Sequence, residues 1–205
     1  MLSPRLLIAT TNPGKLREFR EMLGGDRFAW DDLSAHKNIT PPEETGTTFH
    51  ANACLKASYY ATRLNVWTVA DDSGLEVDAL GGAPGVLSAR WAEVNGAGRG
   101  DADNNTFLLR QLRDVPDDRR TARFVCVLAL ADREGRVILT ARDAVEGRVL
   151  RGPRGTGGFG YDPLFLVPEL GLTTAELPSD QKHKISHRGK ALGRMRALMS
   201  RAALA

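Results

Sequence analysis

The hydrophobic pattern at the start of the chain predicts a strand, a loop and a helix. Residues 6–10 are mostly apolar and short enough for a buried strand, and residues 11–14 are turn-forming. The next apolar residues fall on one helical face, and we expect Gly24-Gly25 to end this helix. That face consists of Leu16, Phe19, Met22 and Leu23.

The helical period returns after a proline-rich segment. Its apolar residues span 49–64, and Thr47 or Thr48 is able to cap the predicted helix. Residues 67–70 then resemble a strand, so we expect the acidic segment 71–74 to form a loop at its carboxyl end. Ligands of α/β proteins bind at the carboxyl ends of strands, and the position therefore favours a functional site.

The rest of the chain predicts a mixed α/β fold. We expect a helix over 105–112, a nearly continuous apolar strand over 124–131 and a turn at Glu134-Gly135. The weakly alternating segment 137–150 should return antiparallel, which would make the central sheet mixed. A short strand over 164–167 and an amphipathic C-terminal helix complete the pattern.

The composition favours an ordinary globular protein. Hydrophobic residues make up 42% of the 205 residues, and the net charge is only +3, although residues 181–205 hold seven Lys or Arg and no acid. No apolar run is long enough for a membrane span or a secretory signal, so we expect a cytoplasmic protein without a membrane partner. The modest net charge leads us to expect no nucleic-acid partner. Cys54 and Cys126 should be buried, reduced thiols, because no Cys/His cluster suits zinc.

A polar segment between the first predicted strand and helix is a candidate phosphate site. Free backbone N–H groups at a helix start attract phosphate, and a lysine adds positive charge. A simple Pro-Gly turn is the alternative, because the longer GxxxxGK[ST] loop is absent. The segment consists of Thr10, Thr11, Asn12, Pro13, Gly14 and Lys15.

Asp71 and Asp72 are the main candidates for a metal site. Adjacent carboxylates repel each other unless a cation offsets their charge, and Mg²⁺ binds phosphates through one or two carboxylates. Glu44, beside Glu43 in the loop before the second helix, is able to supply another carboxylate. An acidic surface turn is the alternative for the aspartates, and interaction with the helix dipole is the alternative for the glutamates.

The glycine-rich segment 155–163 contains aromatic residues that suit a nucleotide base. Phe159 and Tyr161 are able to stack on a base, and Asp162 is able to accept a hydrogen bond from it or orient a neighbour. A hairpin with buried aromatics is the alternative. His187 and Arg188 are able to donate to a purine carbonyl oxygen, although both also suit a helix start at the surface.

Seven blocks in this order resemble the inosine triphosphate pyrophosphatase family over nearly the whole chain. The blocks are Thr10-x-Asn12-x-x-Lys15, Glu43-Glu44-Thr45-Gly46, Asn52-Ala53 with Lys56, Ala70-Asp71-Asp72-Ser73-Gly74-Leu75, Gly81-Gly82-Ala83-Pro84-Gly85, Gly157-Gly158-Phe159-Gly160-Tyr161-Asp162-Pro163 and Ser186-His187-Arg188-Gly189. The resemblance implies a single elongated domain, 1–205, with two lobes, a central mixed β-sheet flanked by helices and an active-site cleft between the lobes. It also implies a homodimer and Mg²⁺-dependent hydrolysis of ITP, dITP and XTP to the monophosphate and pyrophosphate.

The resemblance also implies roles for individual residues. Glu44 and Asp72 match metal ligands, and Asp72 also matches the proton acceptor, a role that Asp71 is able to share. Lys56 matches a lysine near the phosphates, and Ser73 matches a substrate contact. The remaining positions that match nucleotide-binding residues are Thr10, Asn12, Lys15, Phe159, Gly160, Tyr161, Asp162, Lys182, His187 and Arg188.

Two departures and three other functions need to be considered. Thr11 stands where the family often has glycine, and residues 92–101 look specific to this lineage. A pyrophosphatase for pyrimidine or modified nucleotides would share the metal chemistry. An RNA-binding module would use the basic C-terminal segment but would not need the acidic residues. A Ser-His-Asp hydrolase is disfavoured, because the chain has no GxSxG motif.

Overall fold

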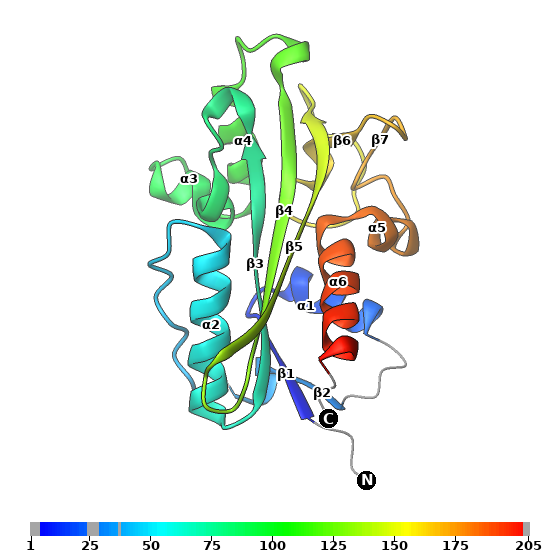
Figure 1. Cartoon of the computed structure of the whole chain (residues 1–205). Coiled ribbons are helices and arrows are strands. Elements are labelled where there is room, and N and C mark those ends of the chain that lie inside the picture. Colours follow the sequence, from blue (N-terminus) through cyan, green and yellow to red (C-terminus); the bar gives the residue numbers. More distant parts are fainter. Residues whose placement is uncertain (1–4, 24–28, 37, 203–205) are drawn as a thin grey trace. The chain divides into compact units, whose positions relative to one another are not determined.

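The computed structural model describes residues 5–23, 29–36 and 38–202, and Figure 1 labels its helices and strands. Gly24-Gly25, where we expected the first helix to end, lies outside the described residues. The strands are β1 Arg5–Ala9, β2 Ala29–Asp32, β3 Trp67–Val77, β4 Thr121–Ala131, β5 Val137–Val149, β6 Phe165–Val167 and β7 Leu172–Thr173. The α-helices are α1 Pro13–Met22, α2 Phe49–Leu64, α3 Trp91–Val94, α4 Asp101–Gln111, α5 Ser179–Ile185 and α6 His187–Arg201.

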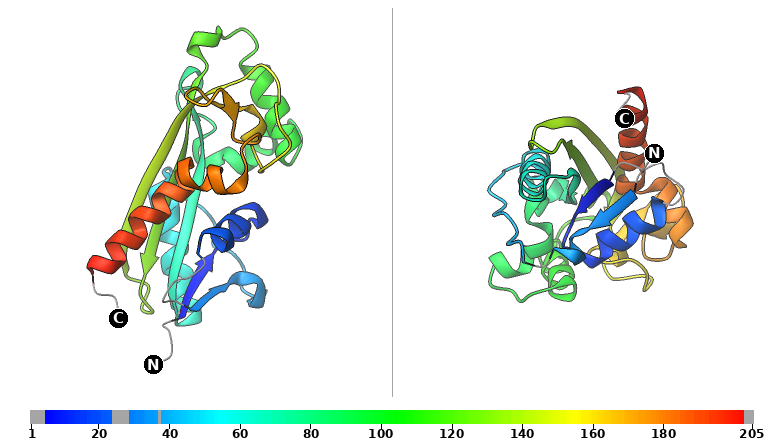
Figure 2. Two further views of the ribbon diagram at one scale, coloured as in Figure 1. Left: turned by 90° about the vertical axis from the view of Figure 1, so that its right-hand side faces the viewer. Right: turned by 90° about the horizontal axis from the view of Figure 1, so that it is seen from below.

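The strands form one open sheet in the order β2-β1-β3-β4-β5-β6-β7. Strand β1 pairs in parallel with both β2 and β3, whereas β6 pairs antiparallel with β5 and β7. The prediction of a mixed α/β fold is therefore confirmed. The strands β3, β4 and β5 are the long ones, as the left view of Figure 2 shows.

The described chain divides into two compact units, each made of several segments. Unit 1 comprises residues 1–72, 126–143 and 189–205, and unit 2 comprises residues 73–125 and 144–188. Each is described below by itself.

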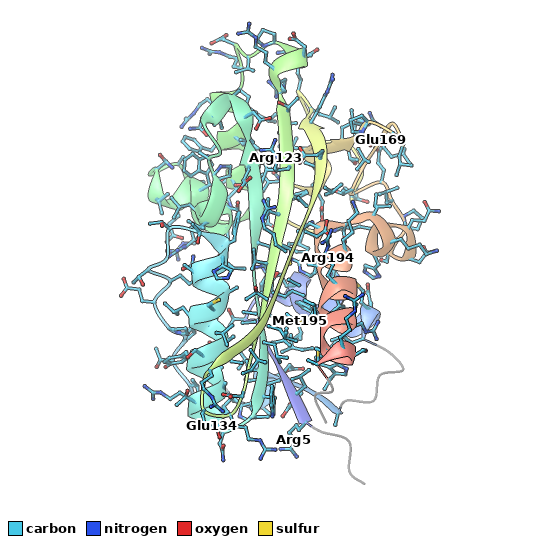
Figure 3. The ribbon with its side chains drawn as sticks, in the orientation of Figure 1. Arg5, Arg123, Glu134, Glu169, Arg194 and Met195 are labelled. Carbon is cyan, nitrogen blue, oxygen red and sulfur yellow. The ribbon has the colours of Figure 1, made fainter. Side chains whose placement is uncertain are left out.

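Unit 1 packs the N-terminal strands and the C-terminal helix around one core. In its parallel register, Leu6 of β1 lies opposite Trp30 of β2 and Trp67 of β3. Along α6, Met195 is buried in this core, while its neighbour Arg194 is exposed and forms an ion pair with Asp143 (Figure 3). The buried core residues are Leu6, Ile8, Phe19, Leu23, Val69, Cys126, Leu128, Leu130, Ala141, Ala191, Leu192, Met195 and Met199.

Unit 2 has a separate core beneath α4. The indole N–H of Trp91 donates to Gln111 Oε1 over 2.7 Å and so joins α3 to the end of α4. Arg120 is buried, and its Nη1 donates to the Leu112 carbonyl over 2.6 Å, which satisfies an otherwise open carbonyl at the C-terminus of α4. The core residues are Leu75, Val77, Leu108, Leu112, Ala122, Phe124, Val145, Val149, Tyr161, Leu164, Phe165 and Val167.

Several predicted boundaries need correction. The acidic segment 71–74 is not a loop, because β3 continues to Val77 with Leu75 and Val77 buried. Helix α4 begins at Asp101 instead of residue 105, since Asp101 and Asp103 provide a favourable acidic first turn.

Smaller differences concern the C-terminal helix and one thiol. His187 and Arg188 are the first residues of α6, but both are buried and do not lie at the surface, as the alternative for them held. Cys54 is only partly buried, unlike Cys126, and both are free thiols. None of the described helices combines the length and apolar character needed to cross a membrane.

Candidate active site

An acidic group in unit 1 consists of two adjacent aspartates of β3, Asp71 and Asp72, together with Glu44. Asp71 and Asp72 are 2% and 5% exposed, which is costly for carboxylates that lack nearby cations. Lys15 Nζ of α1 lies 2.5 Å from Asp71 Oδ1. The buried Cys126 thiol of β4 donates to Asp71 Oδ2 over 3.3 Å. The ammonium of Lys15 therefore offsets the charge of Asp71.

Lys56 of α2 serves the same purpose for Asp72. Its Nζ donates to Asp72 Oδ1 over 2.8 Å and to Glu44 Oε1 over 2.9 Å, so both predicted metal ligands contact one ammonium. Burial alone would lower the pKa of Lys56, but the charges of Asp72 and Asp71 outweigh it and raise the pKa. Burial also raises the pKa of Asp72, against the opposing effects of Lys56 and Lys15.

The polar segment before α1 shapes the start of that helix. Asn12 is its N-cap, and Asn12 Oδ1 accepts from the Lys15 backbone N–H over 3.0 Å. The Asn12 N–H in turn donates to Thr10 Oγ1 over 3.2 Å. Thr11 and Pro13 are exposed and Gly14 is buried. Capping therefore orders the segment and directs Lys15 toward Asp71, while the phosphate-binding role of these residues stays a prediction.

The acidic group suits a divalent cation, although the described residues contain no cluster of three or more His, Cys, Asp or Glu side chains placed to hold a metal. Asp72 Oδ2 is buried and has no hydrogen-bond partner within the described part of the chain. An unsatisfied buried carboxylate oxygen is costly, and a hard cation would relieve that cost. Glu44 is half-buried and accepts from the same Lys56 ammonium as Asp72. Two neighbouring carboxylates are the usual protein ligands of Mg²⁺.

A second group, in unit 2, is built around Phe159. The Phe159 backbone N–H donates to Asp162 Oδ2 over 2.8 Å, and Lys182 Nζ donates to the same oxygen over 2.6 Å. Asp162 Oδ1 accepts from Thr174 Oγ1 over 2.7 Å. We expected Asp162 either to accept a hydrogen bond from a base or to orient a neighbour. These bonds support the second role. Lys182 Nζ lies 5.3 Å from the centroid of the Phe159 ring, within cation–π range.

Tyr161 differs from Phe159 in its exposure. It is only 4% exposed, belongs to the core of unit 2 and donates its hydroxyl to the Ser88 carbonyl over 2.9 Å. Burial accordingly raises the pKa of Tyr161. Phe159 is only half-buried. Because the Tyr161 ring has no open face, the structure does not support the predicted stacking of Tyr161 on a base, and Phe159 alone is available for it.

The first residues of α6 continue this second group. Arg188 is 1% exposed, donates from Nη2 to Ser73 Oγ over 2.7 Å and lies 5.7 Å from the Phe159 ring centroid. His187 stacks on Phe124, with ring centroids 4.9 Å apart and an interplanar angle of 15°. The structure thus brings together the predicted base-binding residues Phe159, Asp162, Lys182 and Arg188, along with Ser73.

Comparison with known proteins identifies the family. The sequence model of the Ham1 family matches residues 6–198. The chain belongs to the Ham1 family. It is 48% identical over 196 residues to the dITP/XTP pyrophosphatase of Exiguobacterium sibiricum, covering 96% of this chain and 97% of that protein.

Solved structures agree with this assignment. A HAM1 protein from Coxiella burnetii superposes with a TM-score of 0.85 at 38% identity, covering 97% of this chain and 99% of that one. A nucleoside-triphosphatase described as a dITP/XTP pyrophosphatase, from Mycobacterium abscessus, has a TM-score of 0.74 at 41% identity over 93% and 98% of the two chains. The resemblance inferred from the seven sequence blocks is confirmed.

Within this Ham1 fold, several residues near the two groups were missed by the sequence analysis. Cys126 looked like an ordinary core residue, and only the structure shows its contact with Asp71. Ser88, whose carbonyl accepts from Tyr161, carried no recognisable signal. Asp101 and Asn105 contact Gly160, and their spacing of four residues on one helix was a signal that could have grouped them.

Proposed function

We propose that this member of the Ham1 family hydrolyses deaminated purine nucleoside triphosphates, such as ITP, dITP and XTP, to the monophosphate and pyrophosphate. The observation that carries the proposal is the acidic group itself. Two buried aspartates are held by Lys15 and Lys56, and Asp72 keeps one carboxylate oxygen without a hydrogen bond among the described residues. Burying two carboxylates on one strand costs free energy, and proteins retain such a cost mainly at functional sites. Curated relatives named dITP/XTP pyrophosphatases support the same substrate class.

The acidic group would act on the triphosphate. Glu44 and Asp72 would hold Mg²⁺, which would neutralise charge on the phosphate oxygens. Lys15 and Lys56 would offset the remaining charge, since each reaches its carboxylate through a flexible side chain able to turn toward a phosphate. Thr10, Asn12 and the N-terminus of α1 would bind further phosphate oxygens.

The hydrolytic step needs one proton acceptor. The oxygen of water would bond to one phosphorus of the α–β anhydride while the bond from that phosphorus to the bridging oxygen breaks. The bridging oxygen would keep the electron pair and leave with the other phosphate product, and one proton of water would pass to Asp72, with Asp71 able to share the role. The raised pKa of Asp72, due first to burial, makes this carboxylate a better base than an exposed aspartate.

The group around Phe159 would bind the base. Phe159 would stack on the purine, and Arg188 and His187 would donate to the carbonyl oxygen that hypoxanthine and xanthine share. Adenine carries an amine donor at that position, so the same donors would reject it. Lys182 would add a donor whose position is set by Asp162.

One assay tests the proposal. Purified protein should release pyrophosphate from ITP, dITP and XTP in the presence of Mg²⁺ and lose this activity with a chelator. Asp72→Asn should lower turnover by at least about 100-fold, the usual scale for loss of an acid–base group. Wild-type turnover in Asp72→Asn, or equal kcat/KM for ITP and ATP, would show the proposal to be wrong. Including dTTP and UTP separates it from a pyrimidine-directed enzyme.

We also propose that the protein is a cytoplasmic homodimer that binds no nucleic acid. The family resemblance supports the dimer, and the modest net charge of +3 supports the lack of nucleic-acid binding. Light scattering at micromolar concentration should give twice the chain mass of 22.3 kDa. A monomer would contradict the dimer without affecting the proposed reaction.

A further inference from the structure

Helix α4 contacts the turn that carries Phe159, and both contacts come from residues without an assigned role. Residues 159–162 form a tight turn in which the Asp162 N–H donates to the Phe159 carbonyl over 3.2 Å. Gly160, inside this turn, has a φ of +59°, a conformation that favours glycine. Its own N–H and carbonyl point out of the turn and need partners elsewhere.

Both partners lie on one face of α4. The Gly160 N–H donates to Asp101 Oδ2 over 2.6 Å, and Asn105 Nδ2 donates to the Gly160 carbonyl over 3.0 Å. Asp101 and Asn105 are four residues apart and so lie one above the other along the helix. One peptide unit on each side of Gly160 is therefore held by a separate side chain, which fixes the turn in both position and direction.

The helix is itself firmly placed within unit 2. Asn104 is buried and bonds two backbone groups, accepting from the Ala92 N–H over 2.8 Å and donating to the Ala89 carbonyl over 3.1 Å. Arg120 holds the other end of α4 through the Leu112 carbonyl. Because α4 is held near both ends, its contacts fix the position of the turn.

Asn105 also shows a feature that helix stability alone does not explain. Its Oδ1 is buried and has no hydrogen-bond partner among the described residues, which costs free energy. Turning the amide around would place Oδ1 against the Gly160 carbonyl oxygen and lose the existing bond. The residue therefore retains an unfavourable acceptor in order to donate to Gly160.

We propose that Asp101 and Asn105 are positioning residues for the base: they hold Gly160 so that the Phe159 ring stays where a purine stacks on it. The inference rests on the proposed function, in which Phe159 contacts the base. It predicts that loss of either contact weakens the binding of ligands that contain a base and leaves binding of pyrophosphate alone unchanged.

The test compares two inhibitors of pyrophosphate release from ITP. IMP contains the base, whereas pyrophosphate does not. In Asp101→Ala and Asn105→Ala, the inhibition constant of IMP and the KM for ITP should rise roughly fivefold to tenfold, as expected when one hydrogen bond no longer orders the turn. The inhibition constant of pyrophosphate should stay within about twofold of wild type, a selectivity that general loosening would not produce.

Matched controls come from the same helix. Asp103→Ala removes an acidic residue from the same first turn, where Asp103 accepts from the Arg99 N–H, and Thr106→Ala removes a side chain next to Asn105. Both controls should keep the wild-type constant for IMP. Asp101→Asn, which retains an oxygen acceptor, should recover much of the lost affinity.

The possible outcomes are distinct. A wild-type protein that releases no pyrophosphate from ITP would overturn both the proposed function and this inference. An active wild type with unchanged IMP inhibition in Asp101→Ala and Asn105→Ala would overturn the inference alone. Equal weakening of IMP and pyrophosphate at an unchanged melting temperature would also overturn it, because the contacts would then not be specific to the base.

Discussion

At the scale of single residues, the most unusual feature is the burial of two neighbouring carboxylates on a strand. Asp71 and Asp72 each contact a different lysine, Lys15 from α1 and Lys56 from α2. Each lysine side chain is also largely buried, so these ion pairs differ from surface pairs that water screens. Their removal should have effects well above those of ordinary surface substitutions.

Lys15→Met should destabilise the protein by about 3 kcal/mol, because it leaves a buried Asp71 carboxylate without this cation. The double variant Lys15→Met/Asp71→Asn should lose less than the sum of the two single variants, with a coupling of about 1 to 3 kcal/mol. Urea unfolding of all four proteins measures this coupling. Additive losses would mean that the ion pair contributes no net stability.

Lys56→Met should make the protein more dependent on Mg²⁺. Without metal, Glu44 and Asp72 would lose their shared ammonium, and the melting temperature should fall by several degrees, about what 1 kcal/mol gives in a chain of this size. Mg²⁺ should then raise the melting temperature more than in wild type, because it no longer competes with Lys56. The exposed Lys190→Met is the control. Equal Mg²⁺ shifts in Lys56→Met and wild type would contradict this idea.

At the scale of elements, strand β3 determines where the candidate site lies. Its second half packs against the 3₁₀ helix η3, Gly85–Arg90, through Ser88, whose Oγ accepts from the Leu75 N–H over 2.9 Å. This close approach depends on the absence of a side chain at Gly74. An added Cβ there would lie 2.7 Å from the Gly85 carbonyl oxygen and 2.8 Å from Ser88 Cβ.

Gly74→Ala should therefore destabilise the protein by about 2 kcal/mol or more, since backbone atoms of η3 would have to move. Gly152→Ala is the matched control, because a Cβ at Gly152 would meet no atom within 4 Å. Thermal unfolding of the two variants should separate them by several degrees. Similar melting temperatures would show that η3 yields easily.

An ion-pair network ties the end of β3 to β4 and β5. Arg123 Nη1 lies 2.9 Å from Asp78 Oδ1, and Arg123 Nε lies 3.0 Å from Glu146 Oε1. The hydrogen bond from Thr121, followed by Arg123, lowers the pKa of Asp78 below its ordinary value of 3.8. A depressed carboxylate pKa adds stability above the unfolded pKa, and this stability disappears as the pH falls through the folded pKa.

Asp78→Asn should accordingly lower the unfolding free energy at pH 7 by no more than about 1 kcal/mol, because the carboxylate is exposed enough for solvent to screen it. The difference from wild type should shrink as the pH falls below about 4, where the carboxylate becomes protonated in both states. Unfolding curves of both proteins at pH 7, 5 and 3 would measure this difference in unfolding free energy. A difference that stays constant to pH 3 would assign the loss to the hydrogen bond instead of the charge.

Prediction from sequence worked where one periodic signal dominated an element. Helix α2 was predicted at its observed position, because the apolar period runs along the whole helix, and Thr48 is one of the two caps that the sequence offered. The continuation of β3 was missed because Asp71 and Asp72 look like loop residues until Lys15 and Lys56 are known to neutralise them. The sequence also could not predict that Tyr161 is buried while Phe159 is only half-buried, since burial depends on partners such as Ser88 that are distant in sequence.

At the scale of the whole molecule, each compact unit is assembled from segments far apart in the chain. Unit 1 contains both β1 and α6, so its core forms only after α6 has been synthesised. Four buried residues of α6 belong to its core: Ala191, Leu192, Met195 and Met199.

A chain that ends at Arg188 should therefore fail to form a cooperative unit 1, as circular dichroism on heating would reveal. Met195→Ala offers a milder test and should cost about 2 to 4 kcal/mol, the usual range for a buried methionine. The adjacent Arg194→Ala should cost less than about 1 kcal/mol, as the arginine side chain is exposed and its ion pair with Asp143 lies partly in solvent. Comparable losses from both variants would contradict the assignment of α6 to this core.

The distribution of indole rings gives the molecule built-in optical probes. Trp30 and Trp67 lie opposite Leu6 in unit 1, whereas Trp91 belongs to unit 2 and is hydrogen-bonded to the last residue of α4. Replacing the first two with phenylalanine would leave Trp91 as the single indole, on α3 and hydrogen-bonded to α4, the helix that contacts the Phe159 turn. Its emission could then follow nucleotide binding in real time, without any label attached to the protein.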